Sequence, residues 1–318
     1  ITCRDWSSDV CSSDLMTVEQ LRELLEENTK NANEEFKRVF HGRGGLFEGW
    51  KHLTVDSIDT ILNVALFMQD EKEEELLAML RDFVSTSRYT TLVVQRRYLK
   101  GAPSDVLIGE VPENLFALEN GMKFKLNLLS NQNSLYFPDM KNGRAFVREN
   151  ARDKRVLNLF SYTCAFSVAA KLGGALSVLN MDMSKGALSV GRANHHLNGI
   201  DTKGVSFLPH NILKSFSRIR KDAPYDLIII DPPTLQKGSF EATKDYEKII
   251  KRLHEMSSEG SMVLACLNAP ELDSEFIIRL FDELAPEFTF VKRLENVQEF
   301  ASQEEERSLK NLLFMRSK

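Results

Sequence analysis

The second half of the chain alternates short apolar segments with longer amphipathic ones, and this alternation restricts the possible folds more than any other feature. The expected strands are Val156–Phe160, Leu176–Met181, Val205–Leu208, Leu227–Ile230, Ser261–Leu267, Phe288–Leu294 and Leu312–Met315. The expected helices are Ala165–Leu172, Ser184–Leu197, Asp245–Met256 and Ser274–Leu284. Continuous apolar strands separated by helices are typical of a parallel α/β sheet covered on both faces. Ligands of such sheets bind beyond the carboxyl ends of the strands.

The residues at the ends of the first three expected strands indicate a nucleoside site. The first strand leads into a turn that opens a helix, made of Phe160, Ser161, Tyr162 and Thr163. Its hydroxyls and backbone N–H groups would face a ligand, while the absent G-x-G-x-x-G pattern counts against a dinucleotide. Asp182 ends the second strand and could accept both hydroxyls of a ribose, although it could equally cap the next helix. Asn211 follows the third strand, where its amide could bind an adenine edge.

The fourth and fifth strands carry the sharpest candidate residues. The fourth ends in Asp231-Pro232-Pro233-Thr234. The prolines cannot continue a ladder because they lack N–H donors and have a fixed φ. They would hold Asp231 and the following carbonyls as a rigid group of acceptors, suited to an amine-bearing or ring-nitrogen ligand, with a plain strand-ending turn as the alternative. Cys266, in the fifth strand, is either small core filler or a nucleophile.

The first third of the chain has a helical periodicity over residues 16–87. Expected helices begin near Met16 and cover Val55–Met68 and Glu71–Val84. The glycine-rich segment His41–Gly45 could contact phosphate, but no strand is expected before it and no Walker lysine follows, so a helix-breaking turn is favoured. The region after it is expected to form the strands Thr90–Arg97, Val106–Glu110, Leu115–Glu119 and Lys123–Leu129.

The charge of the chain is mildly acidic overall but unevenly placed. With 41 Lys+Arg, 46 Asp+Glu and 42% hydrophobic residues, the composition is that of a globular protein of net charge −5. No apolar run approaches the ~20 residues of a membrane span, and the few cysteines indicate a reducing cytoplasm. Positive charge gathers in Arg88–Lys100, which has no acid, and in Lys141–Arg155. These segments could contact phosphate or could be solvated faces without a partner.

The first fifteen residues are treated separately. Ile1–Leu15 begins without methionine and lacks both the basic and the apolar region of a signal peptide. It resembles a translated sequencing-adapter fragment, so we expect a natural start at Met16, with a genuine leader as the alternative. The segment holds one Arg and three Asp, and without it the formal charge of −5 becomes −3.

Three motifs together resemble class I S-adenosylmethionine (SAM)-dependent methyltransferases: Val156–Phe166, Met181–Ser184 and Asp231–Thr234. Four earlier segments look like those of the bacterial 23S ribosomal RNA large-subunit methyltransferases, whose members make 5-methylcytosine or 7-methylguanine: Glu119–Phe124, Tyr136–Met140, Asn142–Arg144 and Val147–Asn150. The resemblance implies a Rossmann-like seven-stranded catalytic domain after a smaller α+β domain. We divide the chain into a leader (1–15), a helical region (16–87), a β-rich substrate-recognition segment (88–150) and the catalytic domain (151–318).

The resemblance also implies roles for particular residues. The Phe160–Thr163 turn would hold the methionine part of SAM, Asp182 the ribose and Asn211 the adenine amino group, and Met183 would also contact the cofactor. Asp231 and Pro232 would border the methyl group and the target base. The residues expected on the substrate side are Asp139, Arg144, Pro233, Thr234, Arg96 and Arg97. One departure is that Cys164 and Ala165 replace glycines common in the first motif of the family.

The resemblance leaves the target base open. Cys266 lies where cytosine-modifying relatives have their nucleophile, whereas Thr234 resembles the guanine-modifying relatives. We therefore predict methyl transfer from SAM to a nucleobase of RNA, 23S ribosomal RNA in particular, without a metal. The alternatives are a small-molecule or protein methyltransferase and a catalytically silent relative that binds RNA or ribosome precursors.

Overall fold

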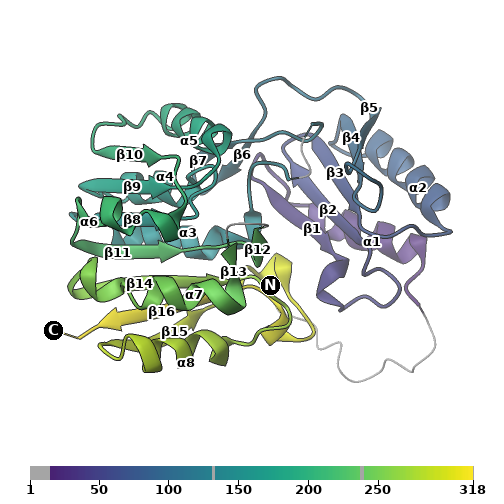
Figure 1. Cartoon of the computed structure of the whole chain (residues 1–318). Helices are drawn as coiled ribbons and strands as arrows, with labels where there is room; N and C mark the ends of the chain where they lie inside the picture. The colour runs from purple at the N-terminus through teal and green to yellow at the C-terminus, as the bar shows by residue number, and fades with distance from the viewer. Residues whose placement is uncertain (1–14, 131–132, 237–239, 318) are drawn as a thin grey trace.

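The computed structural model of the chain describes residues 15–130, 133–236 and 240–317, which form two lobes (Figure 1). The leader expected at 1–15 lies outside the described residues except for Leu15. The carboxyl-terminal lobe contains a seven-stranded sheet and the amino-terminal lobe a five-stranded one. None of the described helices is long and apolar enough to cross a membrane.

The sheet of the carboxyl-terminal lobe has the strand order β10-β9-β8-β11-β14-β16-β15. Its strands are β8 (Arg155–Leu159), β9 (Ser177–Met181), β10 (Val205–Leu208), β11 (Tyr225–Ile230), β14 (Ser257–Leu267), β15 (Phe288–Leu294) and β16 (Lys310–Arg316). The first five in spatial order are parallel, and β16 is antiparallel to both of its neighbours. This sheet confirms the predicted α/β class, and each expected strand of this half corresponds to one of its strands.

Helices cover both faces of this sheet. They are α3 (Lys141–Asn150), α4 (Ala165–Leu172), α5 (Lys185–Leu197), α6 (Phe216–Arg220), α7 (Ala242–Ile250) and α8 (Ser274–Leu284). Ile228 and Ile230 of β11 belong to the core cluster that includes side chains of α7 and α8, whereas Leu227 and Ile229 belong to the cluster with α3 and α4. Successive side chains of a strand point to opposite faces, so an all-apolar strand such as β11 is buried on both.

The amino-terminal lobe has its five strands in the order β1-β2-β3-β4-β5, with two helices on one face (Figure 1). Its elements are α1 (Val18–Thr29), β1 (Lys37–His41), β2 (Leu53–Ile58), β3 (Ile61–Leu66), α2 (Glu73–Thr86), β4 (Thr91–Arg96) and β5 (Ser104–Ile108). A capping box opens α1, with the Thr17 and Gln20 side chains each bonded to the other's backbone N–H. Apolar side chains of both helices and of the sheet form one core cluster.

The prediction of a helical region over 16–87 is wrong, because its middle part forms strands. The expected helix Val55–Met68 is the β2–β3 hairpin, in which Ile58 pairs with Ile61. Both strands are buried along almost their whole length, so their apolar residues do not show the period-2 alternation of a half-buried strand. The sheet also crosses the boundary expected at 87/88, since β4 pairs with β3.

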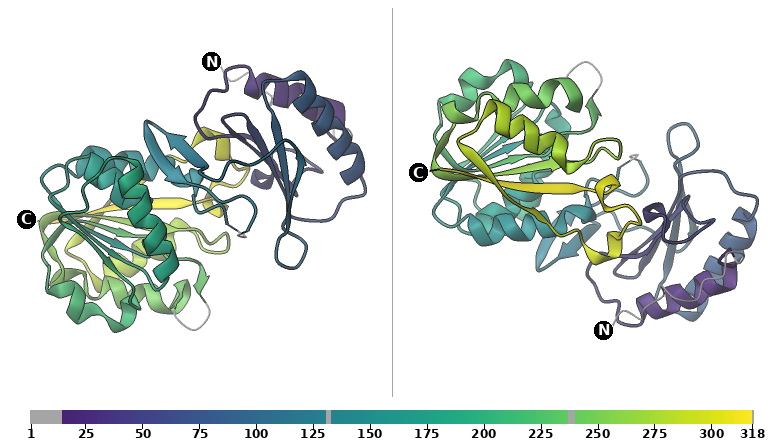
Figure 2. Two further views of the ribbon diagram at one scale, coloured as in Figure 1. Left: turned by 90° about the horizontal axis from the view of Figure 1, so that it is seen from above. Right: turned by 90° about the horizontal axis from the view of Figure 1, so that it is seen from below.

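The lobes meet through two segments that lie between them in every view (Figure 2). One is a hairpin of two short strands, β6 (Phe116–Glu119) and β7 (Met122–Lys125), and the other is the loop between β15 and β16. In the hairpin turn, Asn120 N donates to Glu35 Oε1 at 2.8 Å. In the loop, Gln303 N donates to Gly44 O at 2.8 Å. These contacts hold the amino-terminal sheet beside the carboxyl-terminal edge of the larger sheet.

Candidate active site

The turn between β8 and α4 lies at the carboxyl edge of the parallel strands. Phe160, Tyr162 and Cys164 have positive φ values of 56°, 43° and 60°, and Ser161 N donates to Met181 O at 3.2 Å. The Ser161 hydroxyl is buried and has no hydrogen-bond partner in the described part of the chain. Residues in strained conformations gather at ligand sites, and buried polar atoms are normally bonded. The turn therefore has the features of a preformed ligand site with one open hydrogen-bonding group.

The same turn is tied to the segment that precedes α3. The Thr163 hydroxyl donates to Leu135 O at 2.8 Å, and the rings of Tyr162 and Phe137 lie 5.5 Å apart. Thr163 thus uses its proton within the protein, which leaves only its oxygen lone pairs for a ligand. The substrate-side segment and the turn are packed together as one wall.

Cys164 is accommodated by a glycine on α5. A Cβ atom on Gly191 would lie 2.5 Å from Cys164 Sγ and 2.9 Å from its Cβ. Gly191 is buried in the helix, so neither side chain can move away into solvent. A cysteine at the first-motif position is therefore paired with a glycine at the facing position of α5.

This pairing can be tested with a double-mutant cycle. Gly191→Ala is expected to lower the free energy of unfolding by about 1–3 kcal/mol through overpacking. In a Cys164→Gly background the same substitution should cost less, with a coupling energy of at least about 0.5 kcal/mol. Urea denaturation of the four proteins measures both values. An equal cost of Gly191→Ala in the two backgrounds would show that the thiol does not create the crowding.

Asp182 follows β9 at the edge of the sheet, and its carboxylate bonds to the turn between β8 and α4. Its Oδ2 accepts from Tyr162 N at 2.9 Å and its Oδ1 from Ser184 N at 2.8 Å. The cap of α5 is Ser184, whose hydroxyl accepts from Ala187 N, so the alternative of Asp182 as the helix cap is not needed. A carboxylate offers about four lone-pair sites. Asp182 can therefore still accept ribose hydroxyls, and that role stays a prediction.

Met183 and Asn211 come together at the ends of β9 and β10. Asn211 Nδ2 lies 3.6 Å from Met183 Sδ, and the Met183 side chain is 46% exposed. Asn211 Oδ1 also accepts from Lys214 N at 3.2 Å. An exposed thioether beside an amide offers an apolar face and polar atoms to a flat base, as the adenine role expected of Asn211 requires.

The Asp231-Pro-Pro-Thr segment follows β11. Pro232 is buried and Pro233 is exposed. The Thr234 hydroxyl donates to Asn268 O at 2.5 Å, which ties the loop after β11 to the end of β14. Thr234 is therefore bonded within the protein, and Pro233 is the residue of the segment that faces outward.

Asp231 and Asp139 form a pair of carboxyl groups at this edge. Burial and then the charge of Asp139 raise the pKa of Asp231 to about 7, while Arg144 opposes the rise. Burial also raises the pKa of Asp139, against the charges of Arg144 and Arg38. Asp139 Oδ1 is buried and has no partner among the described residues. Two such carboxyl groups titrate as a coupled pair, so one of them can hold a proton near neutral pH.

Arg144 does not have the RNA-contacting role expected of it. Its side chain is 2% exposed, and its Nε and Nη2 donate to the two carboxylate oxygens of Glu119 at 2.8 and 2.5 Å. Its Nη1 donates to Phe137 O at 2.9 Å, and the Tyr136 hydroxyl also donates to Glu119. A guanidinium that is bonded on all sides cannot reach a phosphate. Arg144 instead anchors the segment that carries Asp139.

Arg96 is likewise engaged within the protein. Its Nε donates to Glu73 Oε1 at 2.7 Å and its Nη1 to Asp105 Oδ2 at 2.5 Å. Of the three arginines expected on the substrate side, Arg96 and Arg144 are therefore held in ion pairs within the protein. Of the three, Arg97 is the one that lines the cavity described below.

Cys266 lies directly beside Asp231 on the sheet. Ile230 pairs with Ala265 in the β11–β14 register, so the next residues of the two strands are neighbours. The thiol is fully buried, and burial together with the charges of Asp231 and Asp139 raises the pKa of Cys266 well above its usual value. A nucleophilic cysteine needs a lowered pKa, so these surroundings favour the core-filler interpretation.

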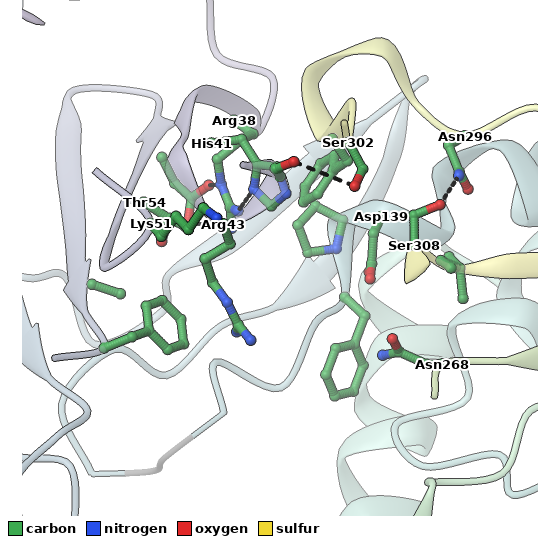
Figure 3. Close-up of a pocket in the computed structure, with 18 of the residues that line it drawn as sticks. Arg38, His41, Arg43, Lys51, Thr54, Asp139, Asn268, Asn296, Ser302 and Ser308 are labelled. Carbon is green, nitrogen blue, oxygen red and sulfur yellow. Dashed lines mark hydrogen bonds and ion pairs between the residues drawn. The ribbon is translucent and has the colours of Figure 1, made fainter. Parts of the chain in front are cut away.

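A cavity of about 700 Å³ lies between the lobes, next to the carboxyl pair (Figure 3). Asp139, Phe137 and Asn268 line it from the carboxyl-terminal lobe. Its other wall comes from the amino-terminal lobe and carries the cations Arg38, Arg43, Lys51 and Arg97, the acid Asp56 and the ring of His41.

Sequence reasoning missed Arg38 and His41 of this wall because the strand that carries them, β1, has no alternation. β1 is broken by a register shift between Arg38 and Phe40, and a bulge of this kind removes the period-2 pattern. The glycine cluster around Arg43 was the available signal.

The chain has close relatives in fold and more distant ones in sequence. Ribosomal RNA large subunit methyltransferase I of Aeromonas salmonicida is 29% identical over 227 residues, which are 68% of this chain and 57% of that protein. The enzyme of the same name from Erwinia tasmaniensis is 28% identical over 260 residues, covering 79% of this chain and 64% of its own length. Ribosomal RNA large subunit methyltransferase K/L of Pseudoalteromonas translucida is 30% identical over 202 residues, covering 62% of this chain and 28% of that protein. The chain thus spans less than two thirds of these curated relatives.

Among solved structures, a SAM-dependent methyltransferase from Streptococcus mutans superposes with a TM-score of 0.84 at 25% identity, over 96% of this chain and 83% of that one. The methyltransferase SMU.776, complexed with SAH, gives a TM-score of 0.83 at 25% identity, over 95% and 80% of the two chains. Residues 37–315 match the family described as S-adenosylmethionine-dependent methyltransferase. Since this match takes in both lobes and the whole candidate site, the chain belongs to the SAM-dependent methyltransferase family.

Proposed function

We propose that the chain transfers a methyl group from SAM to a nucleobase of large-subunit ribosomal RNA. The observation that carries the proposal is that Asp139, next to Asp231 at the sheet edge, faces a cavity whose opposite wall bears Arg43, Lys51 and Arg97. The chain as a whole is acidic, at −5, so this local positive wall favours a substrate with phosphate groups. The relatives named for ribosomal RNA methylation support the choice of RNA.

Some residues of the site would bind the cofactor and others would bind the base. The open Ser161 hydroxyl, Asp182 and Asn211 would hold SAM, whose sulfonium supplies an electrophilic methyl group. The base would leave its stack, at a cost of a few kcal/mol, and enter the cavity edge beside Asp231. There the Asp231 carboxylate and the carbonyls that follow it accept hydrogen bonds from N–H groups of the base. These bonds orient the base for attack on the methyl group.

The surroundings of Cys266 favour a nitrogen over carbon 5 of cytosine as the methyl acceptor. Methylation of that carbon requires a thiolate to add to the ring first, and the buried Cys266 thiol has a raised pKa. A nitrogen lone pair needs only orientation toward the methyl group. The proposed acceptor is therefore a base nitrogen.

A labelling experiment tests the proposal. The protein is incubated with methyl-labelled SAM and with ribosomal RNA from a strain that lacks the gene, and the modified nucleotide is mapped by mass spectrometry. We expect label in large-subunit RNA and little in RNA from the parent strain. Cys266→Ala should keep activity within about threefold, because the thiol forms no bond to the base. Label only in protein or in small molecules would overturn the proposal, and SAM binding with no labelling at all would identify a silent relative.

A further inference from the structure

Phe137 is the one exposed residue among the phenylalanines, tyrosines and tryptophans of the described ranges. It is 42% exposed and lines the cavity between the lobes. Single exposed apolar side chains are common on protein surfaces, but the other large ones in the described part of this chain are not aromatic. The exposed ring of Phe137 is therefore a candidate for contact with a ligand of the cavity.

The backbone of Phe137 is held in place by its neighbours. Its carbonyl oxygen accepts from Arg144 Nη1 at 2.9 Å and from Met140 N at 3.3 Å. The next residue is Pro138, which restricts Phe137 to extended backbone, and the observed angles are φ −120° and ψ 98°. Because Arg144 is itself held by the buried Glu119, the ring projects from a rigid segment. Little ordering of this segment is then needed when a flat ligand covers the ring.

The ring of Phe137 also lies against the turn that is expected to hold SAM. The ring centroids of Phe137 and Tyr162 are 5.5 Å apart, with 49° between the ring planes, and Tyr162 belongs to the turn between β8 and α4. Asp139, two residues further along, borders the cavity, and Asn268 borders it from the end of β14 (Figure 3). A base that covers Phe137 would thus lie between the cofactor and these two polar side chains.

Asp139 and Asn268 offer both kinds of hydrogen bond to the edge of a base. Asp139 Oδ1 is buried and has no hydrogen-bond partner within residues 15–130, 133–236 and 240–317. The Asn268 amide provides one acceptor and two donors, and the backbone of Asn268 is tied to the loop after β11 by the Thr234 hydroxyl. Polar groups beside an exposed ring match a nucleobase, which is flat and carries its polar atoms at its edge.

We propose that the ring of Phe137 is the platform on which the target base stacks after it leaves the RNA helix, with its polar edge toward Asp139 and Asn268. The inference rests on the proposed function and adds to it the contact with the face of the base. Every base has a π-face, so the ring would contribute affinity without selecting the base. The selection would come from the polar groups, of which an ionised Asp139 only accepts hydrogen bonds.

Kinetic measurements on matched variants test the platform. Phe137→Leu keeps an apolar side chain without a ring, and Phe137→Trp keeps a ring. The control Leu176→Ala shortens a residue that is 60% exposed and precedes β9, at the end of the strand away from the site. With ribosomal RNA from the strain that lacks the gene, Phe137→Leu should lower kcat/KM for RNA about tenfold, while Phe137→Trp and the control stay within about threefold of the wild type. Affinity for SAM and thermal melting should not change, whereas a merely structural role of the ring would alter them.

The fluorescence of Phe137→Trp reports on stacking directly, because a stacked base quenches the emission of an indole. The two tryptophans already in the chain are shared with the parent protein, so the difference between the two proteins reports on position 137. An RNA fragment that contains the labelled nucleotide, added together with S-adenosylhomocysteine, should quench the variant more than the parent. S-adenosylhomocysteine alone should quench both proteins equally.

The outcomes separate the platform from the proposed function. If the wild type methylates RNA and Phe137→Leu does so equally well, the platform is wrong and the function stands. Quenching of Phe137→Trp by S-adenosylhomocysteine alone, together with weaker SAM binding by Phe137→Leu, would assign the ring to the cofactor and overturn the inference. If the wild type methylates no RNA, both the function and the platform are wrong.

Discussion

Replacement of Arg144 by methionine is expected to lower the free energy of unfolding by about 3–5 kcal/mol. The substitution leaves the carboxylate of Glu119, which is 1% exposed, without the guanidinium that bonds both of its oxygens. That charge, together with the Tyr136 hydroxyl bonded to it, would remain in a dry environment. Urea denaturation followed by circular dichroism measures the loss. Arg148→Met, one turn further along α3, removes a bond to Asn120 O but no buried ion pair, and should cost below about 1 kcal/mol.

A second variant shows whether the unpaired charge causes the loss. In the double variant Arg144→Met/Glu119→Gln, the buried carboxylate is absent, so most of the cost of the single substitution should be recovered. The pKa of Glu119 is held below its usual value by Arg144 and by Tyr136 against the effect of burial. The penalty of Arg144→Met should therefore shrink as the pH falls and the unpaired Glu119 takes up a proton. A pH-independent loss that the double variant does not relieve would show that packing of Arg144 alone is responsible.

The carboxyl-terminal lobe was predictable because its strands are buried on both faces and separated by helices. Each such strand appears as an unbroken apolar run, as in Leu227–Ile230, and the residue that ends it lies at the ligand-binding edge by topology. Asp182, Asn211 and Asp231 could be placed at that edge without any knowledge of contacts.

The amino-terminal lobe could not be predicted from periodicity. β2 buries the polar residues Thr54, Asp56 and Ser57 as well as apolar ones, and β3 is apolar at every position but Asn63, so no two-residue pattern marks either strand. These polar residues can be buried in a sheet because residues of neighbouring strands pair with them. Arg38 and Asp56, for example, pair across β1 and β2.

The roles of the arginines also could not be predicted from the sequence. Arg97 and Arg144 each lie in a basic segment of the sequence, and what separates them is the kind of residue that each contacts in the fold. Glu119 lies 25 positions before Arg144 and neutralises it, whereas Arg97 shares the ring of Phe67 with Arg43. Local positive charge could mark the basic segments, but the contacts of each arginine come from residues far away in the sequence.

Asp231→Asn is expected to lower kcat by about 10²-fold or more while leaving SAM affinity within a few-fold. The amide has one acceptor oxygen and adds a donor where the base presents N–H groups. For the wild type, kcat should rise with pH through about 7, since the carboxylate is the form that accepts those bonds and its pKa is raised to about 7. Assays with a saturating RNA fragment between pH 5.5 and 8.5 measure the profile. Asp139→Asn is the matched variant, and it should move the midpoint to lower pH because the charge of Asp139 raises the pKa of Asp231.

Asp231→Asn should also stabilise the protein at high pH. A carboxyl group whose pKa is higher in the folded state than in the unfolded one binds its proton more tightly when folded, so stability is lost as pH rises from about 4 to about 7. Asp231→Asn removes this loss, and its free energy of unfolding should exceed that of the wild type by up to about 4 kcal/mol above pH 7. Below pH 4 the two proteins should be alike. The neighbouring Cys266 and Tyr246 have pKa values raised well above their usual range, so they stay neutral over this interval. A stability difference that does not vary with pH, or a kcat profile of the wild type that is flat through pH 7, would show that Asp231 is already ionised and that its proton has no part in the reaction.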